Sequence, residues 1–319
     1  MIQMGKSMTI DTCLDCIVCV SQDKIPGFGE DSFCYRVTEE GVLLGVFDGC
    51  GGSGAKKYPA YQNRSGAYMS ARAIAGAVYQ WMEDAHSSEL SRNCQTMKAH
   101  ILQGLSICKE NCGGQGSKLK GSISKEFPTT AAVACCAVEG DDLLAECYWA
   151  GDSRVYLLDE NGLAQLTADD LDDPDAFENI SGDGVLTNVI SASMPFTLHS
   201  RRIALQKPSL VFAVSDGCYG YIPSPMEFEG VLLEQLQRSQ NMAEFEENLR
   251  AAFAKTAGDD FTLTGAFFGF GTFPIVKKVF WKRYQALIQG YLSHISRESE
   301  SRKEVWNRYR RGYYRYYKG

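Results

Sequence analysis

The chain has 319 residues, of which 45% are hydrophobic and 22% are charged. This composition excludes a disordered or low-complexity chain and allows a sizeable buried core. The formal net charge is -7, yet residues 276–319 contain 12 Lys or Arg and 3 Glu, so that segment carries +9 and the rest of the chain -16. An acidic body favours cation binding, whereas a basic end favours contact with an acidic surface, its own body included.

Three features of the sequence indicate a cytoplasmic protein. Residues 1–11 lack a basic stretch followed by an apolar one, so we expect no secretory signal. The apolar stretch 261–276 contains three glycines, is shorter than the roughly 20 residues of a membrane-spanning helix, and is typical of a strand. Twelve cysteines without a signal favour reduced thiols. The spacing Cys13-x-x-Cys16-x-x-Cys19 is compatible with a metal cluster, but cysteines filling a buried strand are the favoured interpretation.

The hydrophobic pattern predicts groups of strands, each followed by a pair of helices. In the first half we expect a strand over 12–21, a hairpin over 32–38 and 42–47, helices over 64–86 and 88–112, and a hairpin over 130–138 and 143–149. In the second half we expect strands over 155–158 and 163–167, a surface loop over 169–200, a strand over 209–215, helices over 226–237 and 241–255, and a strand over 261–268. This order predicts an α+β domain in which two antiparallel sheets pack together with helices outside.

Carboxylates stand repeatedly at the ends of the predicted strands. The strand over 42–47 runs into Asp48 and a glycine-rich turn, and the strand over 209–215 runs into Asp216. The first hairpin places Glu30 and Asp31 at the same end of the sheet as Asp48, and the further strand-end acids are Asp152 and Asp259. Converging carboxylates repel one another unless cations are present, and Mg²⁺ and Mn²⁺ prefer oxygen ligands. The pattern therefore predicts a site for two divalent cations.

The order of these motifs resembles that of the PP2C (PPM) family of metal-dependent protein phosphatases. The resemblance covers roughly residues 10–270 and depends on the whole series, which is more specific than any one motif. The series is Glu30-Asp31-Ser32, Phe47-Asp48-Gly49-Cys50-Gly51-Gly52, Thr129-Thr130-Ala131, Ala150-Gly151-Asp152-Ser153-Arg154, Leu166-Thr167, Ser215-Asp216-Gly217 and Asp259-Asp260-Phe261-Thr262.

The resemblance implies a four-layer α-β-β-α sandwich over residues 1–275, with a variable flap at about 168–200 and a helical basic tail over 276–319. It implies that Asp48 bridges two Mn²⁺ or Mg²⁺ ions and that the Gly49 carbonyl binds one of them. Asp216 and Asp259 would complete the other position, Glu30 and Asp31 would act through bound waters, and Asp152 with Asp216 would suit a third metal. The implied reaction is hydrolysis of phosphoserine and phosphothreonine in proteins by a metal-bridged hydroxide.

Two departures from the family pattern affect the catalytic assignments. Cys50 stands where family members usually have His, so Cys50 is a candidate general acid, with a small turn residue as the alternative. Pro26 stands where members tend to carry a phosphate-binding Arg, which leaves Lys24 as a candidate phosphate contact. The absence of the usual His and Arg supports an alternative function: a catalytically weak or inactive pseudophosphatase that acts as a binding or regulatory module.

Other features have structural alternatives. Asp152 and Arg154 could form an internal pair that closes a turn, and the acidic run from Asp169 to Asp175 fits a solvated loop better than a calcium site. For the aromatic basic tail we favour docking on its own domain or on a partner chain over binding to nucleic acid or a membrane. Phosphorylated proteins and a cognate Ser/Thr kinase are the expected partners, and the cysteine-rich signalling-type domain suggests a bacterial origin.

Overall fold

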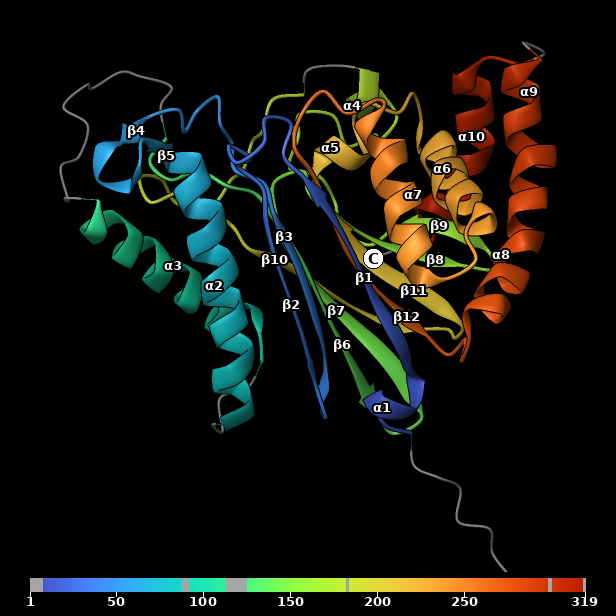
Figure 1. Cartoon of the computed structure of the whole chain (residues 1–319), viewed down its shortest axis with the longest axis horizontal. Helices are drawn as coiled ribbons and strands as arrows, with labels where there is room; N and C mark the ends of the chain where they lie inside the picture. The colour runs from blue at the N-terminus through green and yellow to red at the C-terminus, as the bar shows by residue number, and fades with distance from the viewer. Residues whose placement is uncertain (1–7, 88–91, 113–124, 182–183, 298–299, 318–319) are drawn as a thin grey trace, which may run out of the picture.

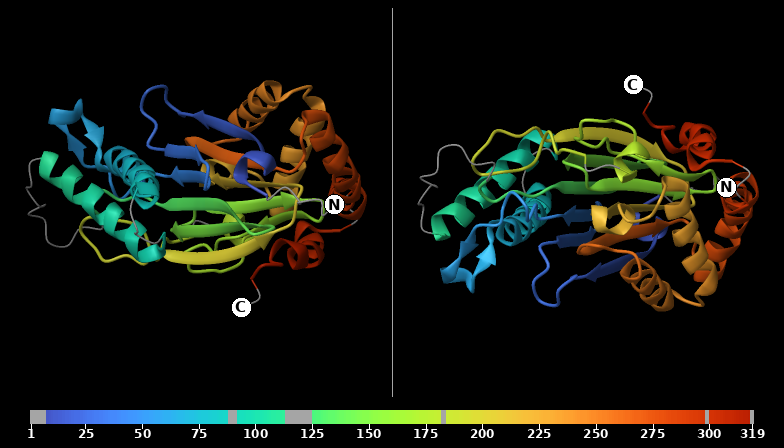
Figure 2. Two further views of the ribbon diagram at one scale, coloured as in Figure 1. Left: turned by 90° about the horizontal axis from the view of Figure 1, so that it is seen from below. Right: turned by 90° about the horizontal axis from the view of Figure 1, so that it is seen from above.

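The computed structural model describes residues 8–87, 92–112, 125–181, 184–297 and 300–317. Within them, two five-stranded antiparallel sheets stack face to face, and helices cover both outer faces (Figures 1 and 2). The predicted α+β class and α-β-β-α layering are confirmed. None of the helices in this part of the chain is both long and apolar enough to cross a membrane.

The first sheet has the order β1-β12-β11-β8-β9. Its second strand, β12, is buried along its whole length and pairs on one side with β1, where Phe261 faces Gln22. The first and last strands of the chain are therefore neighbours. The bounds are β1 Leu14–Gln22, β8 Arg154–Asp159, β9 Gly162–Gln165, β11 Ser209–Val214 and β12 Phe261–Phe268.

The second sheet has the order β10-β7-β6-β3-β2. Strand β3 is fully buried and pairs with β2 in a register that sets Ser32 opposite Phe47. Gly41 opens β3 where a Cβ would lie 2.7 Å from the carbonyl oxygen of Cys136, so this close approach of β3 to β6 requires glycine. The bounds are β2 Ser32–Thr38, β3 Gly41–Phe47, β6 Ala131–Glu139, β7 Asp142–Ala150 and β10 His199–Leu205.

Three hydrophobic clusters hold the layers together. One lies between the sheets and includes Leu44 and Val211, one joins α2 and α3 to the second sheet, and one joins the later helices to the first sheet. Capping residues fix helix starts: Asn93 accepts hydrogen bonds from the backbone N–H groups of Gln95 and Thr96, at 2.9 and 3.0 Å. The bounds are α2 Gly66–Ser87, α3 Cys94–Asn111, α6 Pro225–Arg238 and α7 Met242–Ala254. Short elements are α1 Ile10–Cys13, β4 Lys57–Tyr58, η1 Pro59–Tyr61, β5 Arg64–Ser65, α4 Glu178–Ser181 and α5 Asp216–Tyr219.

The end of the chain packs against the first sheet and α6. It forms α8 Phe273–Leu287, the π-helical turn η2 Ile288–Leu292, α9 Ser293–Ser296 and α10 Arg302–Tyr313. Glu229 of α6 is fully buried and receives hydrogen bonds from Arg283 of α8 and from the hydroxyl of Tyr309 in α10, both at 2.6 Å. Trp306 and Tyr313 are buried in the same cluster, so the aromatic side chains of α10 belong to the core of the domain.

The structure departs from the sequence expectations in three places. Strand β10 lies where we assigned no strand, and its residues alternate between buried and exposed positions as on a sheet edge. The apolar stretch 261–276 is divided, because β12 ends at Phe268 and α8 begins at Phe273. Helix α3 begins at Cys94, and the expected helical residues 88–91 lie outside the described residues.

Candidate metal centre

The backbone of Asp48 is held where β3 ends. The Asp48 N–H donates to Oγ1 of Thr130 at 3.2 Å, and the Asp48 carbonyl accepts from the Thr130 N–H at 2.8 Å and from the Thr129 hydroxyl at 2.7 Å. At Gly49 a Cβ would lie 2.7 Å from the carbonyl oxygen of Ala67, at the start of α2. The glycine after Asp48 is therefore required by the close packing of this turn against α2.

Two further carboxylates lie near Asp48: Asp31, at the start of a strand of the second sheet, and Asp216, after a strand of the first sheet. The pairing of Ser32 with Phe47 sets Asp31 beside Asp48. Ser215, at the end of β11, donates from its hydroxyl to Asp31 at 2.7 Å and accepts from the Thr262 N–H at 2.9 Å. The next residue, Asp216, opens α5, which Figure 1 shows at the same end of the sandwich as the start of α2.

Four carboxyls at this end affect one another electrostatically. Desolvation is the main cause that raises the pKa of Asp31 to about 7 and that of Asp152 to about 8, and the charge of Asp216 raises both further. Desolvation and then the charge of Asp31 raise the pKa of Asp48 well above its usual range. The pKa of Asp216 is also raised by desolvation, although a hydrogen bond with the Asp48 carboxyl opposes the shift. Asp31 is buried, while the other three are half-buried.

A cavity adjoins these carboxyls. It has a volume of about 300 Å³, and its lining includes Asp152, Asp216 and Tyr221 together with Leu171 and Ile180 from the segment after β9. The Tyr219 hydroxyl donates to the Asp152 carbonyl at 2.7 Å, which fixes the turn that carries Asp152. Asp152 and Asp216 thus face a space that a small ligand could enter.

Glu30 and Asp259 lie at the edge of the cluster. Desolvation is the main cause that raises the pKa of Glu30, the Ser65 hydroxyl donates to its carboxylate, and the charges of Asp260 and Asp259 oppose its ionisation. Asp259 is exposed, and its charge also acts on Asp216. All seven carboxyl and carbonyl groups predicted from the sequence therefore lie at one end of the sandwich.

Asp260 has a role that the sequence did not reveal. Its carboxylate accepts hydrogen bonds from the backbone N–H of Lys24 at 2.7 Å and from that of Glu30 at 2.6 Å. Asp260 therefore ties the loop before Glu30 to the start of β12. No local pattern reveals this role, because the two partners of Asp260 lie 230 or more positions earlier in the chain.

The two candidate catalytic side chains occupy different surroundings. The ammonium group of Lys24 donates to the carbonyl of Gly258, so Lys24 is engaged at the loop before β12. The Cys50 Sγ lies 3.9 Å from the Asp48 carbonyl oxygen, and desolvation, followed by the charge of Asp152, raises the pKa of the thiol. Lys125 places positive charge near Cys50, an arrangement that no motif in the sequence signalled.

Arg154 pairs with Asp169, which contradicts the alternative in which Arg154 closes a turn with Asp152. The Arg154 guanidinium donates to both carboxylate oxygens of Asp169, at 2.5 to 3.1 Å, and both side chains are buried. The expectation of a solvated loop over Asp169 to Asp175 is also wrong in part. Asp170 accepts from the Gly151 N–H at 2.9 Å, and Asp175 accepts from the Trp306 indole N–H at 2.9 Å.

The donor chemistry of the cluster suits a hard divalent cation. Several carboxyls share one desolvated region, and the buried cation beside them, Arg154, is already paired with Asp169. As the side chains stand, no group of three or more His, Cys, Asp or Glu in the described ranges is arranged to hold a metal ion. The residue types therefore fit Mg²⁺ or Mn²⁺.

The raised pKa values predict how stability depends on pH when a chelator is present. Because Asp31 and Asp152 bind protons more tightly in the folded state, their contribution to stability is present below about pH 4 and is lost as pH rises through about 7 and 8. We expect the free energy of unfolding in urea to fall by on the order of a few kcal/mol between pH 5 and pH 9. The decrease should be smaller in Asp31→Asn, and an increase with pH in the unaltered protein would contradict the assignment.

Comparison with known proteins identifies the fold. No family model matches the sequence, and no curated protein matches it. The serine/threonine phosphatase PstP/Ppp from Mycobacterium tuberculosis is 18% identical over 80% of this chain and 98% of its own, with a TM-score of 0.56. The PPM Ser-Thr phosphatase MsPP from Mycobacterium smegmatis is 12% identical over 80% of this chain and 99% of its own, also with a TM-score of 0.56.

A third structure contains metal. It is the catalytic domain of PstP in complex with two manganese ions, which is 16% identical over 81% of this chain and 99% of its own, with a TM-score of 0.55. All three structures span most of the described chain at low identity, so the likeness concerns the arrangement of sheets and helices. The chain therefore has the fold of the PP2C (PPM) serine/threonine phosphatases.

Proposed function

We propose that this protein is a Mn²⁺- or Mg²⁺-dependent phosphatase that hydrolyses phosphoserine and phosphothreonine in proteins. The observation that carries the proposal is the coupled cluster of Asp31, Asp48, Asp152 and Asp216, two of which line a cavity, in a fold shared with structures described as serine/threonine phosphatases. The structure of PstP with two manganese ions supports the choice of metal. Phosphorylated proteins, and a kinase that opposes this activity, are then the expected partners.

We assign the following roles to the residues of the acidic centre. Asp48 and Asp216 would hold the cations with help from Asp152, Asp259 and the Gly49 carbonyl, while Glu30 and Asp31 would hydrogen-bond waters around them. When bound, such cations lower the pKa of water and neutralise phosphoryl oxygens. Burial raises the pKa of the Cys50 thiol, so Sγ keeps its proton, which argues against a thiolate nucleophile and makes the thiol a weak proton donor to the leaving alkoxide. Lys125, near Cys50, is better placed than Lys24 to attract a phosphate.

A second candidate function is a pseudophosphatase that binds phosphoproteins without turnover. Two observations favour it: the described carboxylates are not prearranged around a metal, and Lys24 is engaged with the Gly258 carbonyl. In either case the acidic centre and its cavity would be the binding site.

Metal-dependent hydrolysis of a phosphothreonine peptide distinguishes the two functions. We expect purified protein to release phosphate with added Mn²⁺ or Mg²⁺ and to stop when excess chelator is added, because the carboxylates alone cannot activate water. Phosphate release is measured over time at matched ionic strength. If calorimetry detects manganese binding but no phosphate is released, the pseudophosphatase is supported. If the protein neither binds manganese nor releases phosphate, both functions are refuted.

A further inference from the structure

A basic surface lies beside the acidic centre. Residues 49–82 contain four Lys or Arg and no Asp or Glu, although the body of the chain is acidic. Two of these cations, Arg64 and Arg72, stack on the ring of Tyr68, with their guanidinium carbons 4.5 and 3.5 Å from its centroid. Arg64 also lies 5.0 Å from the ring centroid of Phe28, which is 66% exposed. We call Phe28, Arg64, Tyr68 and Arg72 the basic rim.

Hydrogen bonds fix the basic rim to the candidate metal centre. Arg72 donates to the Gly29 carbonyl at 3.1 Å, and Arg64 donates to the Gly27 carbonyl, so both arginines hold the loop that leads to Glu30. Ser65, the residue after Arg64, donates to the Glu30 carboxylate. A peptide with its phosphorylated residue at the centre would therefore pass next to the rim.

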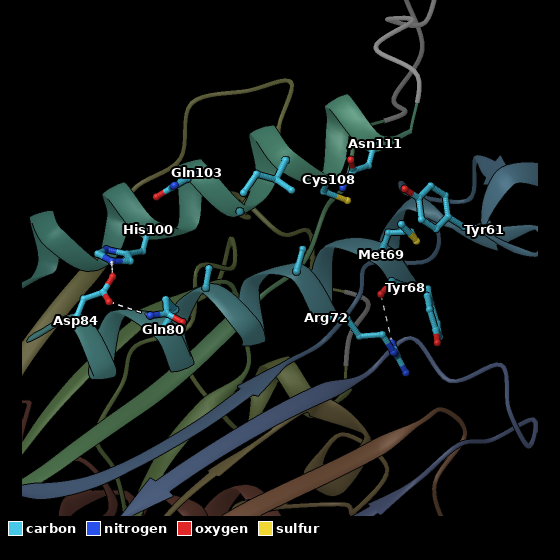
Figure 3. Close-up of a pocket in the computed structure, with 14 residues that line it drawn as sticks. Tyr61, Tyr68, Met69, Arg72, Gln80, Asp84, His100, Gln103, Cys108 and Asn111 are labelled. Carbon is cyan, nitrogen blue, oxygen red and sulfur yellow. Dashed lines mark hydrogen bonds and ion pairs between the residues drawn. The ribbon is translucent and has the colours of Figure 1, made fainter. Parts of the chain in front are cut away.

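The basic rim continues into a groove between α2 and α3. Figure 3 shows Tyr68 and Arg72 at one end of this cavity and the pair of Asp84 and His100, 3.0 Å apart, at the other. Its volume is about 550 Å³, within the range of about 300 to 1,000 Å³ typical of ligand pockets. Its apolar lining recurs at three- and four-residue steps on both helices and includes Met69, Ala73, Ala77, Gly104 and Ile107.

The groove is apolar where it is open. Ile107 lines it and is 50% exposed, which leaves a large aliphatic side chain facing solvent. At Gly104 a Cβ would lie 3.0 Å from the Cβ of Ala77, so small residues let the two helices approach at the base of the groove. A large apolar side chain of a ligand would gain contacts on both helices there.

We infer that the basic rim and the α2–α3 groove together form a docking surface for the segment of a phosphoprotein substrate that flanks its phosphorylated residue. The segment carries an acidic side chain that pairs with Arg64 and a large apolar side chain that enters the groove. Charge complementarity supports an acidic occupant, because guanidinium groups bind carboxylates with two parallel hydrogen bonds. This inference rests on the proposed function and specifies its substrate class.

Peptide scanning tests the inference. In a set of phosphothreonine peptides, one Glu or one Leu is moved through the five positions on either side of the phosphorylated residue. We expect kcat/KM with Mn²⁺ to rise about tenfold at one Glu position and at one Leu position, as for one added charge-assisted or apolar contact. Arg64→Gln should remove the Glu preference and retain the Leu preference. Ile107→Asp should remove the Leu preference and retain the Glu preference. The control Arg250→Gln, on the exposed face of α7, should change neither preference.

A binding measurement separates failure of docking from failure of the proposed function. Fluorescence anisotropy of the same labelled peptides with Asp48→Asn protein reports docking without turnover. If no peptide is hydrolysed but the Glu preference in binding disappears in Arg64→Gln, docking stands and the phosphatase proposal fails. If peptides are hydrolysed with no preference at any position, or if Arg64→Gln retains the Glu preference, the docking surface is refuted.

Discussion

Replacing Asp48 with Asn is expected to lower kcat for a phosphothreonine peptide by on the order of 10² to 10³-fold with saturating Mn²⁺. Asp48 interacts with both Asp31 and Asp216, so an amide there removes a carboxylate from the proposed metal site. The measurement is steady-state phosphate release by the variant and the unaltered protein at matched metal concentrations. Asp172→Asn is the matched control, because Asp172 is an exposed carboxylate outside the cluster and should retain full activity.

Thermal unfolding shows whether a loss of activity in Asp48→Asn comes from misfolding. In excess chelator, desolvation and the charges of Asp31 and Asp216 disfavour the ionised form of the Asp48 carboxyl and raise its pKa. Asn cannot ionise, so the unfolding midpoint of the variant should be equal to or higher than that of the unaltered protein. A lower midpoint together with lost activity would mean that Asp48 supports the fold instead of holding a metal.

Replacing Arg154 with Leu is expected to lower the free energy of unfolding by about 3 to 5 kcal/mol, because Asp169 would remain buried without its cation. Arg154 also donates to the Tyr156 hydroxyl at 2.9 Å, and its guanidinium carbon lies 3.8 Å from the ring centroid of Tyr219. Urea unfolding gives the change in free energy. As a control, Arg202→Leu breaks an exposed pair with Glu139 and should cost less than about 1 kcal/mol.

The double variant Arg154→Leu, Asp169→Leu identifies the cause of that loss. Apolar side chains in place of both charges leave no unpaired charge, so the double variant should regain much of the stability that the single variant loses. If both variants are equally unstable, the loss comes from the contacts of Arg154 with Tyr156 and Tyr219. The ion pair with Asp169 would then contribute little.

The fold and the composition of the acidic cluster follow from local sequence signals. Buried strands ending in Asp48 and Asp216 are visible as apolar runs that stop at an Asp-Gly pair, and hairpin geometry places Asp31 beside Asp48. Strand β10 was missed because it is an edge strand in which the exposed Arg202 and Ala204 alternate with the buried Ile203 and Leu205. That alternation is a strand signal that could have been recognised.

The partners of polar side chains were not predictable in the same way. Asp169 and Asp175 belong to an acidic stretch of sequence that is typical of a solvated loop. In the structure the buried Asp169 carboxylate pairs with Arg154, and Asp175 accepts a hydrogen bond from Trp306, 131 positions further along the chain. Asp260 and Lys24 likewise meet only because β12 lies beside β1. Such contacts depend on tertiary packing, which no local pattern encodes.

The pairing of β1 with β12 has a consequence during synthesis of the protein. β1 is complete at Gln22, but the strand it pairs with in the described part of the chain, β12, begins at Phe261, so a ribosome must add more than two hundred residues before β1 is paired. Throughout that interval Val18 and Val20, which are buried in the finished molecule, belong to a segment that lacks its sheet partner. Until β12 has been synthesised, this apolar segment lacks its sheet partner and is prone to aggregation.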